Sequence, residues 1–567
     1  MKILGISDSK TESGIAFYED GVLKYALNEE RVSRIKVDGS FPYKSLDLFY
    51  NEFCKELDLI DYVVFAGIYT PTPISRLFSF LVDIDKNSNK SAIGNLYRNF
   101  EYFITYKLKL LASIVPDKKK NIFTIHLLKK ILKRKLHPKL QTKKIYLVDH
   151  HMCHASSAFF SSGFNEALMV SLDGFGDGAS GKIYLCNDKR IKQVLSIDAL
   201  DSFGLYYSLI TEFMGFTPEK HEGKVTGLAA YGNAEKVKEK FPFEFGKDKK
   251  PKYKGRGGIK GLKDVKRIFS KYKKEDVASW LQTNVENMIC EMVSYYMVKY
   301  NQSNVCLAGG LTCNVKINQK IHELKQIEKI YIYPAMSDMG LSHGAILSLT
   351  KKKEIIDKVY YGPKYTDEDI ESVLISSFLR YRRIKNIENK IAELLAKGKI
   401  VARFNGEMEY GPRALGNRSI LVQATDKSIN DSLNKKLKRT EFMPFAPTIL
   451  DKFAKKCIIG MDGAELTSKF MNISFKVTDY MKKNCPAAVH VDNTARPQIL
   501  SKKDNESYYK ILSEYNKITG LPAILNTSFN VHEEPIVMTP EDAVKGFKKA
   551  KLDYLAIGNF LVEQSDS

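Results

Sequence analysis

The hydrophobic pattern at the start of the chain predicts three short strands joined by tight turns. Residues 2–7 (KILGIS), 14–18 and 23–28 are rich in the apolar and aromatic side chains typical of strands. The sequence Glu19-Asp20-Gly21, between the last two runs, is typical of a hairpin turn. Residues 61–67 (DYVVFAG) contain a continuous apolar run, which predicts a buried strand.

Farther along, apolar runs alternate with helically spaced segments, which indicates an α/β protein. Strands are predicted at residues 167–172, 304–307, 330–333 and 400–404. Helices are predicted at residues 44–55, 202–215, 342–349, 367–379 and 386–395, and a long helix is predicted to end near Tyr300. Because the pattern changes near residue 363, we expect a first domain at residues 1–360 and a second at residues 385–567.

A lysine-rich stretch interrupts the first domain at about residues 75–144. Its apolar residues are helically spaced, as in residues 102–115 (YFITYKLKLLASIV) and 123–136 (FTIHLLKKILKRKL). A basic amphipathic helix of this kind lies on an anionic membrane, binds a polyanionic partner or packs one face on the protein core. We favour packing on the core and keep peripheral membrane contact as the alternative.

The composition indicates a globular, cytoplasmic protein. With 567 residues, of which 44% are hydrophobic, the chain is long enough for several domains with sizeable cores. The eight cysteines include no C-x-x-C pair, so neither a disulfide framework nor a cysteine-based zinc site is indicated. Met1 leads directly into a strand pattern rather than a signal peptide, and no apolar run reaches the about 18 residues of a spanning helix.

The net charge of +22 is compatible with nucleic acid, an anionic membrane or an acidic substrate as partner. Much of the excess lies in residues 107–144 and 247–274, and the Lys/Gly-rich segment 247–263 has the composition of a linker. Charge carried by insertions and loops is typical of a solvated surface. We therefore expect no specific nucleic acid partner.

Four side chains form a candidate metal site. His150 and His154 are four residues apart, so they share one face if this segment is helical. Asp173 and Asp338 each follow a predicted strand and precede a glycine. Two imidazoles and two carboxylates suit Zn, Fe, Mn or Ni. The alternative is a pair of capping or core histidines, since spacing along the sequence does not show that the four side chains converge.

Other polar residues lie beside glycine or proline, where the backbone approaches a ligand closely. Lys224 lies in a glycine-flanked motif, and Gly309-Gly310 follow a predicted strand; for the latter a simple tight turn is the alternative. Arg413, Arg418 and Arg496 also lie near such rigid turns. A guanidinium held this way suits phosphate or carboxylate, so we interpret these arginines as part of an anion-binding pocket.

Several motifs resemble those of the O-carbamoyltransferases of antibiotic and nodulation-factor biosynthesis. They are DHHMCHA (149–155), EGKVTGLAAYG (222–232), SDMG (337–340), GPRALGNRSIL (411–421), PFAP (444–447), HVDNTARPQ (490–498) and LNTSFN (525–530). The resemblance is collinear over nearly the whole chain. It implies an N-terminal actin-like (ASKHA) duplicated α/β domain followed by a YrdC-like α/β domain. It also implies that the second domain makes carbamoyl-adenylate from carbamoyl phosphate and ATP, and that the first transfers the carbamoyl group to an acceptor hydroxyl and releases AMP.

The same resemblance assigns roles to individual residues. The metal, iron in the family, is expected on His150, His154, Asp173 and Asp338. The adenylation pocket is expected to contain Arg413, Arg418, Lys438, Arg439, Arg496, Asn526 and Ser528. Contacts with the nucleotide are expected from Lys224, Gly309, Gly310, Asn314, His490 and Asp492. The implied cofactors are ATP, Mg²⁺ for adenylation and iron, and the implied partners are carbamoyl phosphate and a hydroxyl-bearing sugar, glycan or secondary metabolite.

Two departures from the family pattern affect these expectations. The first turn reads Ser9-Lys-Thr-Glu-Ser13 where relatives often have His-Asp-Ala-Ser, so the histidine expected near the acceptor is missing. Met443 stands where many relatives have arginine. The competing interpretations are an actin-like ATPase, a carbamoyl-phosphate hydrolase or a basic nucleic-acid-binding protein. A nucleic-acid-binding protein would not require the paired aspartates at strand ends. The sequence specifies neither the acceptor nor the oligomeric state.

Overall fold

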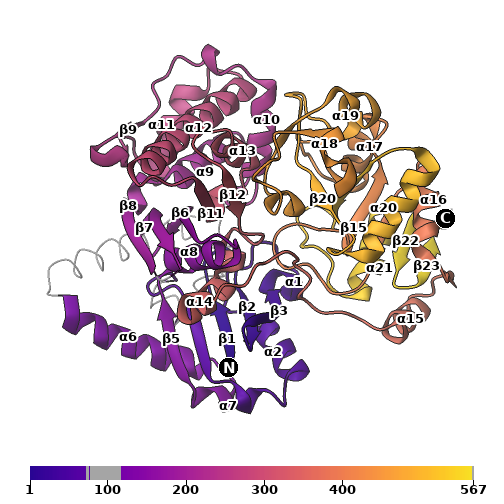
Figure 1. The fold of residues 1–567 in the computed structure, drawn as a ribbon, viewed down its shortest axis with the longest axis horizontal. Helices are drawn as coiled ribbons and strands as arrows, with labels where there is room; N and C mark the ends of the chain where they lie inside the picture. The colour runs from indigo at the N-terminus through magenta and orange to yellow at the C-terminus, as the bar shows by residue number, and fades with distance from the viewer. Residues whose placement is uncertain (72–75, 77–116, 189, 565–567) are drawn as a thin grey trace.

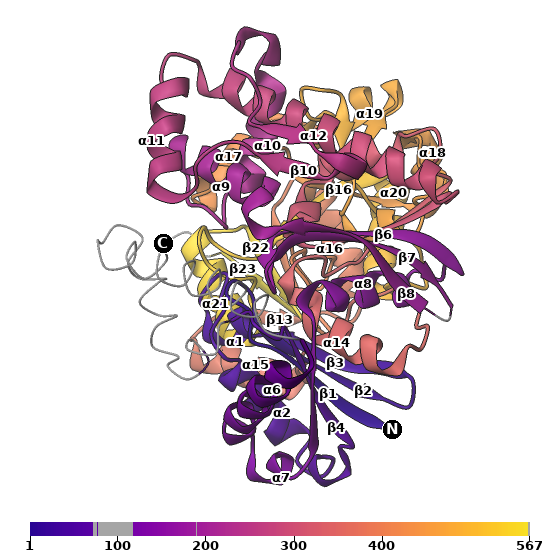
Figure 2. The same cartoon turned by 90° about the vertical axis from the view of Figure 1, so that its left-hand side faces the viewer.

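The chain folds into a mixed α/β structure with several sheets, divided between an N-terminal and a C-terminal half (Figure 1). The computed structural model describes residues 1–71, 76, 117–188 and 190–564. The N-terminal half contains two five-stranded sheets and a small hairpin, and the C-terminal half contains an eight-stranded sheet and a small three-stranded sheet. Figure 2, a view turned by 90° from Figure 1, shows the two five-stranded sheets with helices between them.

The first sheet has the strand order β3-β2-β1-β4-β5. Its strands are β1 (Lys2–Ser7), β2 (Gly14–Glu19), β3 (Val22–Asn28), β4 (Tyr62–Ala66) and β5 (Lys144–Val148). The first three are antiparallel neighbours, whereas β1, β4 and β5 run parallel. The strands predicted at the start of the chain and at residues 61–67 are therefore confirmed.

The second sheet repeats the topology of the first. Its strands are β6 (Glu166–Gly176), β7 (Ala179–Asn187), β8 (Arg190–Asp198), β11 (Asn304–Ala308) and β12 (Lys329–Ile332), in the order β12-β11-β6-β7-β8. Again three strands form an antiparallel meander, and the first of them continues into two parallel neighbours. The N-terminal half is therefore an internal duplication of one five-stranded unit.

Two helices lie between these sheets. Helix α8 (His150–Ser161) packs on the second sheet, α14 (Leu341–Thr350) packs on the first, and the two helices pack on each other. Their buried residues, such as Phe159 and Leu347, belong to one apolar cluster with residues of both sheets. Because α8 begins directly after β5 and α14 begins just after the loop that follows β12, both helices start at the carboxyl ends of parallel strands.

The outer face of the second sheet is covered by a helical region. It contains α9 (Phe203–Phe213), α10 (Glu222–Leu228), α11 (Gly258–Phe269), α12 (Lys274–Lys299) and α13 (Val315–His322), together with the hairpin of β9 (Phe243–Phe245) and β10 (Pro251–Tyr253). The prediction of a linker at residues 247–263 is wrong. This segment contains β10 and the start of α11, because Tyr253 and Gly261 turn inward while the lysines point outward.

The C-terminal half is built on the eight-stranded sheet, in the order β13-β23-β22-β14-β15-β21-β16-β20. The strands are β13 (Tyr381–Arg383), β14 (Val401–Phe404), β15 (Arg418–Gln423), β16 (Ala446–Leu450), β20 (Gln498–Leu500), β21 (Ala523–Ser528), β22 (Tyr554–Ile557) and β23 (Phe560–Glu563). Helices α16 (Ile387–Ala396) and α20 (Glu506–Thr519) cover one face, and α21 (Pro540–Ala550) packs on the other. Helix α15 (Asp367–Ser376) packs on α21.

The two halves share buried contacts rather than a thin connection. Met408 and Ile536 of the C-terminal half pack in the same apolar cluster as Ile6 and Phe65 of the first sheet. Arg31 donates a hydrogen bond to the carbonyl oxygen of Gly411 over 2.7 Å. Because these contacts are buried, the halves form one packed body in which residues from both can line a common site.

Only part of the basic insertion lies within the described residues. Residues 77–116, which include the helical pattern at 102–115, lie outside them. Helix α6 (Asp117–Arg134) is described. Leu128 and Leu132 on it are fully buried, and Leu132 packs in the apolar cluster next to the first sheet. In this part of the insertion the apolar stripe therefore packs on the protein itself.

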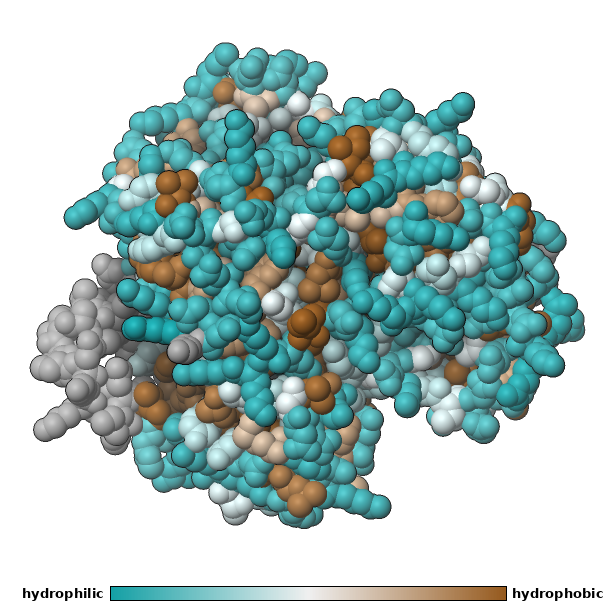
Figure 3. Space-filling model, viewed as in Figure 1, coloured by the Kyte–Doolittle hydropathy of each residue, from teal (hydrophilic) through white to brown (hydrophobic). Residues whose placement is uncertain are grey.

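The face seen in Figure 3 is mostly hydrophilic, with small, scattered hydrophobic spots. Within the described ranges, no helix combines the length and apolar composition required to cross a membrane.

Candidate metal site and interdomain region

The four predicted metal ligands converge at the carboxyl ends of the strands of the second sheet. Asp149 caps helix α8 by accepting the backbone N–H of Met152 over 2.9 Å, and the helix presents His150 and His154 on one face. Strand β6 brings Asp173, and the turn after β12 brings Asp338. Nε2 of His150 lies 2.9 Å from Oδ2 of Asp173, and Nε2 of His154 lies 3.1 Å from the same oxygen.

The arrangement fits a divalent metal ion. One donor atom from each of the four residues lies within 4.8 Å of the other three. Oδ1 of Asp338 is 3.5 Å from Nε2 of His150 and 3.4 Å from Nε2 of His154. Donors bound about 2.1 Å from one ion are themselves separated by roughly 3.0 to 3.4 Å, so these spacings match those of a coordination shell. Oδ1 of Asp338 is also buried and makes no hydrogen bond to any described residue.

The charges of this cluster stabilise one another. Burial by itself lowers the pKa of His150, but the carboxylates of Asp338 and Asp173 outweigh it and raise that pKa to about 9. Burial by itself raises the pKa of Asp173, but hydrogen bonds to His150 and His154 hold it well below its usual range. The carboxylates thus favour a positive charge between them. A metal ion supplies this charge in place of a proton.

Backbone groups and glycines make room for this site. The carboxylate of Asp177 accepts the backbone N–H of His150 over 2.8 Å and those of Ile68 and Tyr69 over 2.9 and 2.6 Å. The N–H of Gly310 lies 3.3 Å from Oδ1 of Asp173, and a Cβ at position 310 would lie only 2.8 Å from that oxygen. Gly309 has a φ of 104°, in the region that favours glycine. Gly309 and Gly310, which we predicted to contact nucleotide, therefore lie against the candidate metal site.

The third histidine of the motif has a different environment. His151 is buried, with Nδ1 2.8 Å from Oγ of Ser171 and Nε2 3.1 Å from the carbonyl oxygen of Ala179. Burial and the charge of His150 lower its pKa to about 3. His151 is thus a neutral residue of the core.

Sequence reasoning missed Glu12, which lies beside the metal candidates. Its carboxyl group accepts a hydrogen bond from Oγ of Ser337, next to Asp338. Thr11 donates a hydrogen bond to Oδ2 of Asp338 over 3.3 Å. Burial raises the pKa of Glu12 to about 8. The only sequence signal was that this first turn departs from the family pattern. Two of the residues that differ, Thr11 and Glu12, are the ones that contact this site.

The predicted arginine pocket lies in the C-terminal half. Nε of Arg413 and Nε of Arg496 are buried and lack hydrogen-bond partners within the described part of the chain. Burial and, after it, the nearby charge of Arg413 lower the pKa of Arg496 to about 9. Two guanidinium groups held close together without hydrogen bonds from their Nε atoms favour an anionic ligand between them.

The other predicted residues of this pocket have varied environments. Arg439 is fixed by Oγ1 of Thr527 over 2.8 Å and by the carbonyl oxygen of Ser528 over 2.9 Å. Asn526 donates to the carbonyl oxygen of Ala414 over 3.3 Å, which places it against the motif that carries Arg413. Lys438 is exposed.

Arg418 is not oriented toward these residues. Its side chain is fully buried and donates to the carbonyl oxygens of Asn405 over 2.7 Å and Gly406 over 3.1 Å. Its guanidinium carbon lies 3.8 Å from the centre of the Phe404 ring. These contacts favour a structural role, in which Arg418 holds the end of β14 against the start of β15.

Several predicted nucleotide contacts lie where the two halves meet. Lys224 donates a hydrogen bond to Oγ1 of Thr440 in the C-terminal half over 2.9 Å. Asp492 forms an ion pair of 2.8 Å with Lys316 of the N-terminal half, and His490 lies 3.4 Å from Asp492. Asn314 instead caps α13 and donates to Gln282 within the N-terminal half, over 2.9 Å.

Cys313 shows that the arginine pocket and the metal candidates belong to one region. Burial raises the pKa of this thiol to about 12, and the next influences on that pKa are the charges of Glu12, Arg413, Asp173 and Asp338. Because such interactions fall off steeply with distance, the thiol lies within range of both groups. Tyr410, three residues before Arg413, donates a hydrogen bond to the carbonyl oxygen of Met339 over 2.5 Å, so the segment that carries Arg413 packs against the turn that carries Asp338.

A second cluster of possible metal ligands lies at another point of the interface. Nε2 of His221 is 2.7 Å from Oε1 of Glu533, and Nε2 of His532 is 3.3 Å from the same oxygen. The positive charges of Lys36 and Lys224 contribute to lowering the pKa values of both histidines, after burial. Since lysines surround this cluster, it is a poorer site for a cation than the one at His150.

Comparison with known proteins identifies the chain. The family described as carbamoyltransferase N-terminus matches residues 2–347, and the one described as carbamoyltransferase C-terminus matches residues 392–564. An uncharacterized protein of Methanocaldococcus jannaschii is 33% identical, and the alignment covers 100% of both chains. Nodulation protein NolNO of Sinorhizobium fredii is 29% identical over 96% of this chain and 78% of its own.

Among solved structures, component A of the (R)-2-hydroxyglutaryl-CoA dehydratase of Acidaminococcus fermentans covers 62% of this chain and 99% of its own, at 12% identity and a TM-score of 0.34. That likeness is too weak to equate the two folds. The family matches, by contrast, span both halves and place the chain among the transferases. It belongs to the carbamoyltransferase family and is an enzyme that transfers a carbamoyl group.

Proposed function

We propose that the enzyme is an O-carbamoyltransferase that works in two steps. In the first, carbamoyl phosphate, water and ATP yield carbamoyl-adenylate, inorganic phosphate and pyrophosphate. In the second, an acceptor hydroxyl attacks the carbamoyl carbon; the bond to AMP breaks, AMP leaves, and the hydroxyl proton is released. Coupling carbamate to AMP provides a stable leaving group, which carbamate itself lacks.

The observation that carries this proposal is the location of two chemically different sites in one interdomain region. Arg413 and Arg496 offer positive charge to the phosphates and carbamate of the first step. The segment that carries Arg413 packs against the turn that carries the metal candidate Asp338, through the hydrogen bond from Tyr410 to the carbonyl oxygen of Met339. An intermediate formed at the arginines therefore has a short path to the second site, and the packed interface limits its exposure to water.

We propose that His150, His154, Asp173 and Asp338 hold a divalent ion, iron by resemblance to the family. Such an ion supplies Lewis-acid polarisation of phosphate oxygens. The residues of the chain position the reactants: Lys224 reaches across the interface with a charge suited to phosphate, and Gly310 directs its N–H toward the site. Mg²⁺ is expected to accompany ATP in the first step.

We further propose how the family architecture corresponds to the fold. Residues 1–360 would form the actin-like transfer domain, a proposal supported by the duplicated five-stranded topology. Residues 385–567 would form the YrdC-like adenylating domain, which contains the arginine pocket. The acceptor is a small molecule or saccharide with a hydroxyl group.

The test is to incubate the full-length protein with ATP, Mg²⁺ and isotopically labelled carbamoyl phosphate and to follow the products. We expect carbamoyl-adenylate by mass spectrometry together with release of pyrophosphate that depends on carbamoyl phosphate. ATP cleavage to ADP and phosphate that is independent of carbamoyl phosphate would instead support the ATPase alternative.

A further inference from the structure

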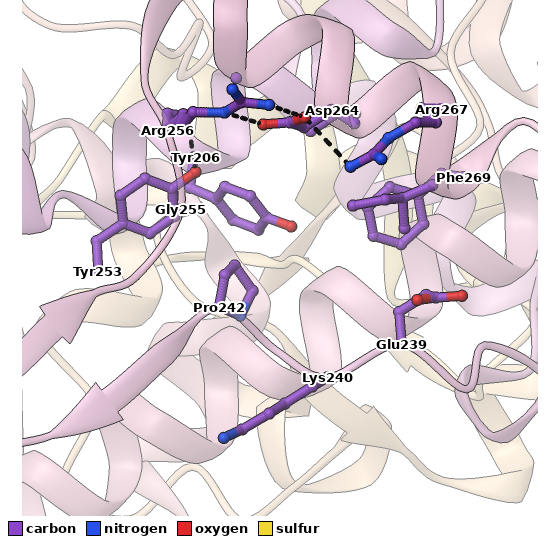
Figure 4. A pocket seen from close by; sticks show the side chains of 13 residues that line it. Tyr206, Glu239, Lys240, Pro242, Tyr253, Gly255, Arg256, Asp264, Arg267 and Phe269 are labelled. Atoms are coloured by element: carbon purple, nitrogen blue, oxygen red, sulfur yellow. Dashed lines mark hydrogen bonds and ion pairs between the residues drawn. The ribbon is translucent and has the colours of Figure 1, made fainter.

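A cavity of about 230 Å³ opens in the N-terminal half, between α9, α11 and the β9–β10 hairpin (Figure 4). The aromatic rings of Tyr206, Tyr253 and Phe269 contribute to its wall. Charged side chains of Arg256, Asp264 and Arg267 lie along one side. Aromatic walls with a few fixed polar groups are typical of small-molecule sites.

Tyr206 places a polar group within the cavity. Its side chain is only 4% exposed, and Figure 4 shows its hydroxyl directed into the cavity. None of the described residues accepts or donates a hydrogen bond at this hydroxyl, whereas that of Tyr253 donates to the carbonyl oxygen of Arg256 over 3.1 Å. The hydroxyl oxygen is open to the cavity rather than enclosed in the core, so it can form a hydrogen bond with a ligand there.

The charged side of the cavity presents donors and acceptors next to each other. Nε of Arg256 donates to Oδ2 of Asp264 over 2.6 Å, and Nη2 of Arg256 donates to Oδ1. Arg267 approaches Oδ1 from the other side, with Nη2 at 3.4 Å. The carboxylate is thereby fixed in place, while both guanidinium groups keep exposed N–H donors.

The charges of the wall select against strongly charged ligands. Arg256 and Arg267 are paired with Asp264, and Glu239 is paired with Lys271. An anion entering the cavity would meet these carboxylates, and a cation would meet the arginines. A neutral ligand with adjacent hydroxyl groups can both donate to Asp264 and accept from an arginine, and its apolar ring face can lie on the aromatic side chains.

The size of the cavity limits which neutral, hydroxyl-bearing ligands can fit. A volume of about 230 Å³ equals that of about eight liquid waters at roughly 30 Å³ each, which accommodates one six-membered sugar ring and its hydroxyls.

Helix α9 connects the cavity to the candidate metal site. Ser202 caps this helix and donates a hydrogen bond to the carbonyl oxygen of Gly174, beside Asp173, over 2.7 Å. Tyr206 lies one helical turn farther on, roughly 6 Å along the axis.

We propose that this cavity is a saccharide subsite that holds one neutral pyranose ring of the acceptor. That the ring belongs to the acceptor rests on the proposed carbamoyl transfer. Binding of a pyranose at Tyr206 does not depend on it, so the two can be tested separately.

The test measures binding of methyl pyranosides (gluco, galacto, manno and N-acetylglucosamine forms) to the full-length protein by saturation-transfer NMR. We expect at least one to bind, and Tyr206→Phe to weaken it by roughly three- to ten-fold through loss of one hydrogen bond. Because the hydroxyl makes no hydrogen bond to a described residue, Tyr206→Phe should keep the wild-type Tm. Asp264→Asn should also weaken binding, whereas the control Tyr554→Phe, in the C-terminal half, should not.

The proposal is overturned if no pyranoside binds or if Tyr206→Phe and Asp264→Asn bind like the wild type. Inorganic phosphate or adenosine binding here in preference to every pyranoside would overturn it as well. Carbamoyl-adenylate formation is assayed on the same samples. Failure of that reaction with intact pyranoside binding would refute the proposed function alone, and intact adenylate formation without pyranoside binding would refute the subsite alone.

Discussion

The carboxylate of Asp177 accepts the backbone N–H of His150 over 2.8 Å and thereby fixes the start of the helix that carries two candidate metal ligands. The same carboxylate accepts the N–H groups of Ile68, Tyr69 and Thr70 over 2.6 to 2.9 Å. One side chain thus joins the loop after β4, the end of β6 and helix α8.

Replacing Asp177 by alanine is expected to weaken metal binding without removing a ligand. Up to four N–H groups would lose their acceptor, and only some could turn to water, so we expect a loss of about 2 to 4 kcal/mol in the free energy of unfolding. Urea denaturation and elemental analysis of the purified variant measure the two effects. Asp188→Ala, at an exposed position near the end of β7, is the matched control and should behave like the wild type. Full metal content and unchanged stability in Asp177→Ala would contradict this role.

Gly310→Ala is expected to disturb the metal site more than the fold. The new Cβ would lie 2.8 Å from Oδ1 of Asp173, so the carboxylate must move away from its position between the histidines. We expect metal content to fall by at least half with a Tm shift of only a few degrees. Gly223→Ala is the control, because its Cβ would meet no atom within 4 Å. Equal metal content in the two variants would show that position 310 does not constrain the site.

The assignment of the metal ligands is tested by His154→Ala. Loss of one of four donors should remove most of the bound metal and the transfer step, while carbamoyl-adenylate formation at the arginines continues. His532→Ala is the comparison, since it removes a histidine from the second cluster. Metal content by mass spectrometry that stays undiminished in His154→Ala and falls in His532→Ala would reverse the assignment.

The parts of this site found from the sequence are those encoded over short distances. The spacing of His150 and His154 defines one helical face, Asp173 directly follows a predicted strand, and Asp338 lies in the turn after another. Asp177 could not be assigned in this way, because its partners Ile68 to Thr70 are about a hundred residues away. Glu12 was overlooked for the same reason, since only the fold brings it to Ser337.

The fold shows a similar limit. Strands β7 and β8 were not predicted, because Gly181, Lys182 and Lys192 interrupt their apolar pattern and part of each strand is exposed. The segment at residues 247–263 resembles a linker in composition, although Tyr253 within it packs against Tyr206 with ring centres 5.6 Å apart. Tyr206 itself was part of an aromatic-rich helix pattern, and nothing in the sequence distinguishes its unpaired hydroxyl from those of other buried tyrosines.

The arginine pocket should control the first step and leave the metal in place. In the full-length protein, Arg496→Ala is expected to lower carbamoyl-phosphate-dependent exchange of pyrophosphate into ATP by at least a hundred-fold, through loss of charge next to the reacting phosphates. Arg383→Ala, at an exposed position on β13, is the control and should retain exchange. Full exchange activity in Arg496→Ala would remove this residue from the adenylation pocket, and metal content should match the wild type in both variants.

Metal binding should strengthen as the pH rises from about 6.5 to 9. His150 has a pKa raised from its ordinary 6.5 to about 9, so a proton occupies this position in the metal-free protein at neutral pH and must leave before the nitrogen can bind an ion. Release of one proton increases the apparent affinity by up to ten-fold per pH unit within this window. Titration of chelator-treated protein with Fe²⁺ under anaerobic conditions, or with Zn²⁺, measures the slope, which should level off above pH 9.

The stability of the metal-free protein should change in the opposite direction. Because the folded state binds the His150 proton more tightly than the unfolded state, its stabilisation is complete below pH 6.5 and is lost as the pH rises through 9, on the order of 3 kcal/mol in total. Glu12, with a pKa raised to about 8, contributes the same sign at lower pH, since the folded state keeps its proton after the unfolded state has released it. Glu12→Gln should remove its own share of the slope, between pH 4.5 and about 8, and leave the share of His150 between pH 6.5 and about 9. Proton displacement at His150 would be contradicted if the wild type and Glu12→Gln each bound metal with the same affinity at every pH from 6.5 to 9.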